Sequence, residues 1–87
     1  MISALKWRSE TVSFKRLSED EAVELIVSLL RTASQPLTTR EIEEKTRKRR
    51  VSCPDRTPVF LNRLRLRGVV KGQLSVERRA WIWWVET

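Results

Sequence analysis

The stretch of sequence that decides the fold is residues 55–85, DRTPVFLNRLRLRGVVKGQLSVERRAWIWWV. Proline has no backbone donor, so Pro58 belongs in the first turn of a helix, and Asp55 as the N-cap places it at the third helical position. Three apolar residues then share one face of this helix: Phe60, Leu61 and Leu64. Gly68 suits the left-handed residue that ends a helix. The spacing therefore predicts a helix over residues 55–67.

Two strand-like runs follow that helix, Val69–Val76 and Arg79–Val85, and a charged turn joins them. An antiparallel register that pairs Gly72 with Trp83 leaves room for the indole over the glycine. In this register one face of the hairpin carries the apolar residues Val70, Leu74, Val76, Trp81, Trp83 and Val85. We expect that face, with both of its indoles, to lie in the core. Trp84 falls on the opposite face, where it packs under the N-terminal arm or in a dimer interface.

Two capping boxes open two further helices upstream. They pair Ser18 with Glu21 and Thr38 with Glu41. After the first box, apolar residues recur at helical spacing: Ala22, Leu25, Ile26, Leu29 and Leu30. We expect this helix to end near Ala33, before an extended connector at residues 35–37, and the second helix to end at about Thr46. Residues 47–54 are then expected to form a long, basic turn.

Residues 1–17 precede the first capping box and form an N-terminal arm. The alternation in Thr11–Lys15 allows a short strand there, and Trp7 gives the arm an apolar side chain to bury. The chain contains no repeats and no linker long enough to divide it. We therefore expect this arm and one small domain, residues 18–87.

Charge is divided unevenly along the chain, which has a formal net charge of +7. Residues 1–46 hold seven Lys/Arg and eight Asp/Glu, whereas residues 47–87 hold eleven Lys/Arg and three Asp/Glu. A basic helix followed by a basic hairpin is the electrostatic pattern expected of a protein that lies along nucleic acid. Arg outnumbers Lys thirteen to five, and guanidinium suits bidentate contacts to phosphate and guanine better than ammonium does.

The chain lacks the residues that several functional classes need. The chain has no His and one Cys, so an internal disulfide and a conventional zinc site are excluded. Neither a phosphate-cradling glycine motif nor a catalytic group of residues appears, so we expect no cofactor and no enzymatic activity. Cys53 has no basic partner and is expected to be structural. No apolar run approaches the ~20 residues that span a bilayer, and residues 1–10 do not resemble a secretory signal, so we expect a cytoplasmic protein without membrane contact.

Two segments carry a family resemblance. Residues 36–42, PLTTREI, resemble the entry into the second helix of the winged helix-turn-helix family. Residues 61–70, LNRLRLRGVV, resemble the end of its recognition helix and the turn into its first wing strand. The order of helix, short strand, helix, turn, helix and hairpin over residues 18–85 is also similar, as in small single-domain regulators of archaea and viruses. The resemblance implies an α+β domain with three helices and a C-terminal β-hairpin wing, preceded here by an extended arm.

The resemblance implies a DNA-binding transcriptional regulator whose third helix enters the major groove and whose wing lies on the backbone. Three residues on the outward side of that helix are candidates to read bases: Arg56, Asn62 and Arg63. Candidates for phosphate contacts come from the turn before the helix and from the wing: Arg47, Lys48, Arg49, Arg50, Arg78 and Arg79. The alternative for each is an ordinary solvated charge.

The sequence leaves two other functions open. An RNA-binding or ribosome-associated winged helix would prefer structured RNA to duplex DNA. A winged helix that binds protein within a larger assembly would show no more affinity for nucleic acid than any basic protein does, and fold alone does not choose among these functions. The target sequence, the sense of regulation and the oligomeric state, monomer or homodimer, also stay open.

Overall fold

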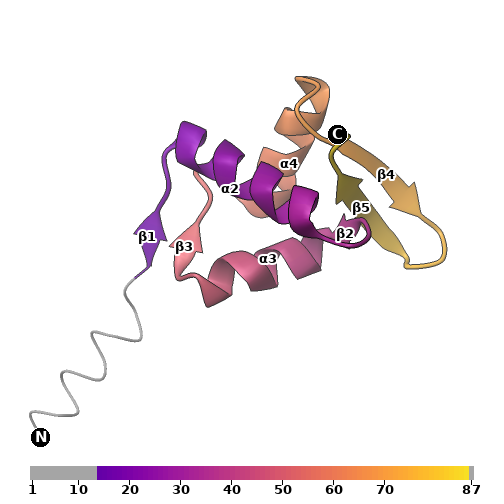
Figure 1. Ribbon diagram of the computed structural model, residues 1–87, viewed down its shortest axis with the longest axis horizontal. Helices are drawn as coiled ribbons and strands as arrows, with labels where there is room; N and C mark the ends of the chain where they lie inside the picture. Colours follow the sequence, from indigo (N-terminus) through magenta and orange to yellow (C-terminus); the bar gives the residue numbers. More distant parts are fainter. Residues whose placement is uncertain (1–13, 87) are drawn as a thin grey trace, which may run out of the picture.

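A computed structural model of the protein describes residues 14–86. Its elements in chain order are β1 (Lys15–Arg16), α2 (Glu19–Thr32), β2 (Leu37–Thr38), α3 (Thr39–Lys48), β3 (Val51–Ser52), α4 (Thr57–Leu66), β4 (Lys71–Ser75) and β5 (Ala80–Trp84). The strands β2, β5 and β4 form an antiparallel sheet in that order, and β1 pairs with β3 in parallel. The β4–β5 hairpin projects at the end of the fold opposite β1 and β3 (Figure 1). The predicted α+β class with three helices is confirmed.

Both predicted capping boxes are present, and they explain where α2 and α3 begin. The Ser18 hydroxyl accepts a hydrogen bond from the Glu21 backbone N–H at 3.2 Å, and Glu21 Oε1 accepts one from the Ser18 N–H at 2.9 Å. Thr38 and Glu41 repeat the arrangement at 3.1 and 2.8 Å. Each box satisfies two backbone donors that the first turn leaves unpaired. The buried face of α2 carries Ala22, Ile26, Leu29 and Leu30, as its spacing predicts.

The predicted long turn over residues 47–54 is wrong. The helix α3 continues to Lys48, the chain reverses at Arg49 and Arg50, and Val51–Ser52 then form β3 against β1. Arg47 and Lys48 lie in the last turn of the helix, where cations are favourable beside the carbonyl end of the helix dipole. The Ser52 carbonyl of β3 accepts a hydrogen bond from the Leu17 N–H, which belongs to a segment far away in the sequence that the local pattern does not reveal.

The helix α4 forms as predicted except at its first turn. Its N-cap is Arg56 and not Asp55, so Pro58 occupies the second helical position, where it still needs no backbone donor. The Asp55 carboxylate instead pairs with the Arg63 guanidinium, and the helix has no side-chain cap hydrogen bond. The three predicted core residues, Phe60, Leu61 and Leu64, are fully buried. Gly68 has a φ of 79° and ends the helix as expected.

The register of the hairpin is confirmed: Gly72 lies opposite Trp83, and Leu74 lies opposite Trp81. A Cβ on Gly72 would lie 2.5 Å from the Trp83 indole, so the glycine is required by the packing of that ring. The strands are shorter than predicted, because Val76–Arg79 form a four-residue turn.

Only the inner half of the predicted apolar face of the hairpin is buried. Val70 and Trp83 are 2% and 3% exposed, and the Trp83 indole N–H donates to the Thr39 hydroxyl at 2.8 Å. The outer half of that face is exposed, with Trp81 at 40%, Leu74 at 57% and Val76 at 88%. The prediction that the whole face lies in the core is therefore wrong for these three residues, because the hairpin extends beyond the helices that cover its base (Figure 1).

The described start of the chain tests only part of the prediction for the N-terminal arm. A strand is present at Lys15–Arg16, next to the predicted segment Thr11–Lys15. Residues 11–13 and Trp7 lie outside the described residues. Within residues 14–86, no helix is both long enough and apolar enough to cross a bilayer.

Candidate nucleic-acid interface

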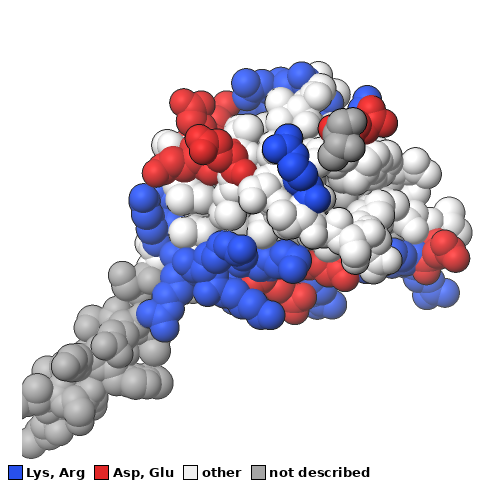
Figure 2. Space-filling view, in the orientation of Figure 1, with Lys and Arg blue, Asp and Glu red and all other residues white. Residues whose placement is uncertain are grey.

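The basic turn, residues Arg47–Arg50, brings four cations to the C-terminal end of α3. All four are exposed, and basic side chains gather at this end of the molecule (Figure 2). Arg49 donates to the Lys45 carbonyl at 3.4 Å. Within residues 14–86, the side chains of Arg47, Lys48 and Arg50 make no hydrogen bond or ion pair. Three side-chain cations of the basic turn are thus available to an anionic partner.

The backbone conformation at Arg50 is unusual for a residue with a side chain. Its φ is 57°, in the left-handed region that favours glycine. Its N–H donates to the Arg47 carbonyl at 3.0 Å, and its own carbonyl accepts from the Lys15 N–H at 3.0 Å. The residue therefore ends α3 and begins the pairing of β3 with β1, and both roles depend on the left-handed conformation and not on the guanidinium.

The two arginines of the hairpin turn, residues Val76–Arg79, have different surroundings. Arg78 forms an ion pair with Glu41 at 2.8 Å and donates to the Pro36 carbonyl at 3.2 Å. The pKa of Glu41 is lowered, first by the Thr38 backbone N–H and further by Arg78. Arg78 thus ties the hairpin to the start of α3. Arg79 is exposed, has a φ of 53°, and makes no side-chain hydrogen bond or ion pair within the described part of the chain.

The outward side of α4 carries Asn62, one of the predicted base readers, between two exposed apolar residues. Val59 and Leu66 are 53% and 71% exposed, and Asn62 is exposed between them. Arg56 stands at the N-terminal end of the helix without a side-chain partner among residues 14–86. This side of the helix therefore combines apolar, amide and guanidinium groups, which are the groups that contact base edges.

Two of the candidate readers on α4 are held by neighbouring side chains. The Asn62 Oδ1 atom accepts from the Arg65 guanidinium at 2.9 and 3.1 Å. Arg63 pairs with Asp55 and lies over the Phe60 ring, with its guanidinium carbon 5.5 Å from the ring centroid. Its Nε atom is buried without a hydrogen-bond partner. A bidentate contact that uses Asn62 Oδ1 or the paired Arg63 nitrogen therefore competes with an internal partner.

The pattern of the sequence did not single out the contact between Arg65 and Trp81. The Arg65 guanidinium carbon lies 5.4 Å from the centroid of the Trp81 ring, and the Trp81 and Trp83 rings stack 5.5 Å apart. These indoles border a cavity of about 200 Å³ between α4 and the sheet, which is also lined by Thr39, Pro58 and Asn62. The absence of a side chain at Gly72, beside Arg65, is the one signal in the sequence for this close approach.

The nine candidate residues do not form one cluster. The basic turn and the hairpin turn lie at opposite ends of the fold, and α3 runs from one end toward the other, with α4 above it in the view (Figure 1). Two side chains, those of Arg63 and Arg78, are engaged in ion pairs within the fold. The structure therefore presents two basic ends and, on α4, an outward side that is mostly uncharged.

Metal binding and thiol chemistry find little support among residues 14–86. Within residues 14–86, no group of three or more His, Cys, Asp or Glu side chains is placed to hold a metal ion. Cys53 is buried, and burial raises the pKa of its thiol, which disfavours the reactive thiolate. No protein-family model, no curated protein and no solved structure matches the chain. A proposal for its function rests on the geometry and the charges described above.

Proposed function

We propose that this protein is a winged helix-turn-helix protein that binds duplex DNA as a non-enzymatic transcriptional regulator. In this proposal α4 enters the major groove, while the basic turn and the hairpin turn contact the phosphates on either side of it. The order and pairing of the elements are compatible with that fold. The two turns lie near opposite ends of α3, and in this proposal they contact the DNA backbone beside the groove.

The observation that carries the proposal is the identity of the residues at two left-handed positions. Within residues 14–86, Arg50 and Arg79 are the two residues other than glycine with a positive φ. This conformation costs a residue with a side chain about 1 kcal/mol or more, and glycine avoids that cost. Neither guanidinium has an ion-pair partner in the described chain. An anionic ligand supplies a reason for arginine at both positions, and nucleic-acid phosphate is the anion that suits a surface this basic.

The proposal divides the candidate residues into two groups. Phosphate contacts come from the cations without an internal ion pair at the two turns: Arg47, Lys48, Arg49, Arg50 and Arg79. Base contacts come from α4, where Arg56 is unengaged and Asn62 and Arg63 exchange their internal partners for bases. Arg78 acts indirectly, because its ion pair with Glu41 holds the hairpin against α3.

The experiment that tests the proposal compares the affinity of the full chain for duplex DNA, single-stranded DNA and structured RNA at two or more salt concentrations. For five phosphate contacts we expect the logarithm of the duplex affinity to fall with the logarithm of the salt concentration with a slope of about −4 to −6. Duplex DNA should bind more tightly than either single-stranded DNA or RNA. A slope near zero would leave no basis for the proposal, and a clear preference for structured RNA would replace it with an RNA-binding function.

A further inference from the structure

The outer side of α2 carries a shallow groove that the proposed DNA-binding surface does not use. The groove has a volume of about 400 Å³ and is lined by Val23, Glu24, Val27, Ser28, Arg31 and Thr32. Val23 packs partly against the core, and Val27 remains partly exposed without joining it. The solvent side of this helix therefore presents an apolar strip with one acidic and one basic residue beside it.

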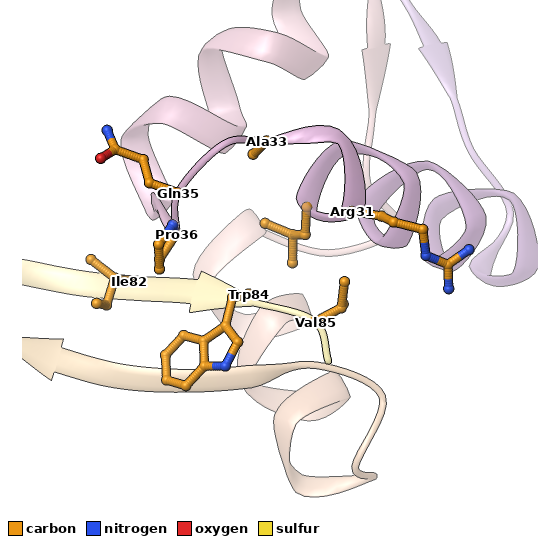
Figure 3. Close-up of a pocket in the computed structure, with 8 residues that line it drawn as sticks. Arg31, Ala33, Gln35, Pro36, Ile82, Trp84 and Val85 are labelled. Atoms are coloured by element: carbon orange, nitrogen blue, oxygen red, sulfur yellow. The ribbon is translucent and has the colours of Figure 1, made fainter. Parts of the chain in front are cut away.

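The two charged residues of this strip have no partner in the described chain. Glu24 and Arg31 are seven residues apart, which places them two turns apart on the same side of the helix, about 10 Å along its axis. Residues three or four apart pair along a helix, and residues seven apart do not. Among residues 14–86, neither side chain takes part in an ion pair. The guanidinium of Arg31 points away from Trp84 (Figure 3).

A second copy of α2, laid antiparallel across this face, satisfies both charges at once. A two-fold axis that passes between Val27 and Ser28 places Glu24 opposite Arg31 of the partner subunit and Arg31 opposite Glu24 of the partner subunit. The same axis puts each Val27 against the small Ser28 of the other copy, which lets the two helices approach closely. A symmetric dimer requires a contact of this type, in which one residue touches a second residue of the partner and that second residue touches the first residue of the partner.

The surface beside this strip is apolar as well. A groove of about 390 Å³ adjoins it at Arg31, between the end of α2 and β5, and its lining includes Leu30, Pro36, Ile82 and Trp84 (Figure 3). A broad area without charged side chains covers this part of the molecule (Figure 2). An antiparallel partner brings the first turn of its own α2 beside that groove, and this turn is acidic, with Glu19, Asp20 and Glu21, so the proposed contact is confined to the strip along the helix.

We propose that the outer side of α2 is the interface of a symmetric homodimer, held by the reciprocal ion pairs between Glu24 and Arg31. The charge pattern selects a second copy of this chain over another partner, because the groove provides both members of each pair at the spacing that an antiparallel copy needs. The proposal does not depend on DNA binding, since it concerns α2 and the proposed function concerns α4 and the two turns.

Sedimentation of the full chain over a concentration series, without nucleic acid, tests the interface. We expect a dimer whose dissociation constant rises at least about tenfold in Glu24→Arg and in Arg31→Glu, because symmetry turns two attractions into two repulsions. The double variant that carries both substitutions should return to within about threefold of the wild-type value, because it restores both pairs with their signs exchanged. Glu44→Arg is the matched control, because it makes the same change of charge at an exposed position of α3.

Circular dichroism checks that each variant keeps its helices. A chain that is monomeric at every concentration overturns the proposal. So does a dimer that survives the single substitutions unchanged, or a folded double variant that does not recover. The duplex-binding experiment has its own readout, so a monomer that binds DNA would remove the dimer and leave the proposed function standing.

Discussion

Arg50 offers a direct test of whether its side chain serves binding, because its backbone conformation and its charge can be changed separately. Arg50→Gly and Arg50→Ala both remove the guanidinium, whereas only glycine relieves the left-handed φ of 57°. The two variants lose the same charge, so the difference between their stabilities isolates the backbone term. We expect the glycine variant to be more stable than the alanine variant by about 1 kcal/mol. For a domain of this size that difference corresponds to about 4–8 °C in melting temperature.

The same two variants should be indistinguishable in binding. Each should weaken binding to duplex DNA and make the salt slope less negative by about one unit, because each loses one phosphate contact. Urea unfolding measures the stabilities, and fluorescence anisotropy with a labelled duplex measures the affinities at several salt concentrations. Two results would refute the reasoning. Equal stability of the two variants would show that the left-handed conformation is not strained, and unchanged affinity in both would show that Arg50 does not contact the ligand.

Three further predictions concern the core, the helix α4 and the capping box. Trp83→Ala should lower the free energy of unfolding by about 3–5 kcal/mol and Trp84→Ala by much less, and the reverse order in urea unfolding would contradict the strand register. Arg63→Ala should weaken the free energy of binding by about 1–3 kcal/mol on a preferred duplex and by little on random duplex, whereas Arg49→Ala should weaken binding to both. Equal losses of affinity on every duplex would show that α4 does not read sequence. The pKa of the Glu41 carboxyl is lower in the folded chain than in the unfolded chain. The stability that this carboxylate contributes is therefore present above its unfolded pKa and is lost as the pH falls through its folded pKa. Glu41→Gln should reduce that loss in acid unfolding curves, and unchanged curves would contradict the assignment.

Local signals in the sequence were enough to predict the helices and the hairpin. A capping box acts over four neighbouring residues, and the two boxes begin α2 and α3 where the sequence places them. Gly68 ends α4 because a left-handed residue is needed there, and that need depends only on the adjacent backbone. The pairing of Gly72 with Trp83 follows from the size of one indole. Each of these features involves residues close in sequence or directly opposite in a hairpin, so a pattern reveals it.

The candidate site was only partly accessible to the same reasoning. The sequence identified where the cations are dense, and the outward positions Val59, Asn62 and Leu66 on α4 follow from helical spacing. It gave no sign that Arg63 is held by Asp55, because an ion pair between surface residues depends on side-chain conformations that no periodicity encodes. The contact of Arg65 with Trp81 likewise needs the helix and the hairpin to be placed against each other.

What the sequence by itself determined is the three helices, the hairpin with its register and the concentration of positive charge after residue 46, because hydrophobic spacing, caps and charge are properties of short segments. The tertiary structure alone decided how far those elements cover one another. It ended the core at Trp83 and left Trp81 exposed, since the hairpin is longer than the helices that pack on its base. It also paired β1 with β3, whose residues are far apart in the chain. The tertiary structure also decided the positive φ of Arg50 and Arg79. A positive φ at a residue with a side chain is imposed by the way the chain must reverse and not by the residue's own preference.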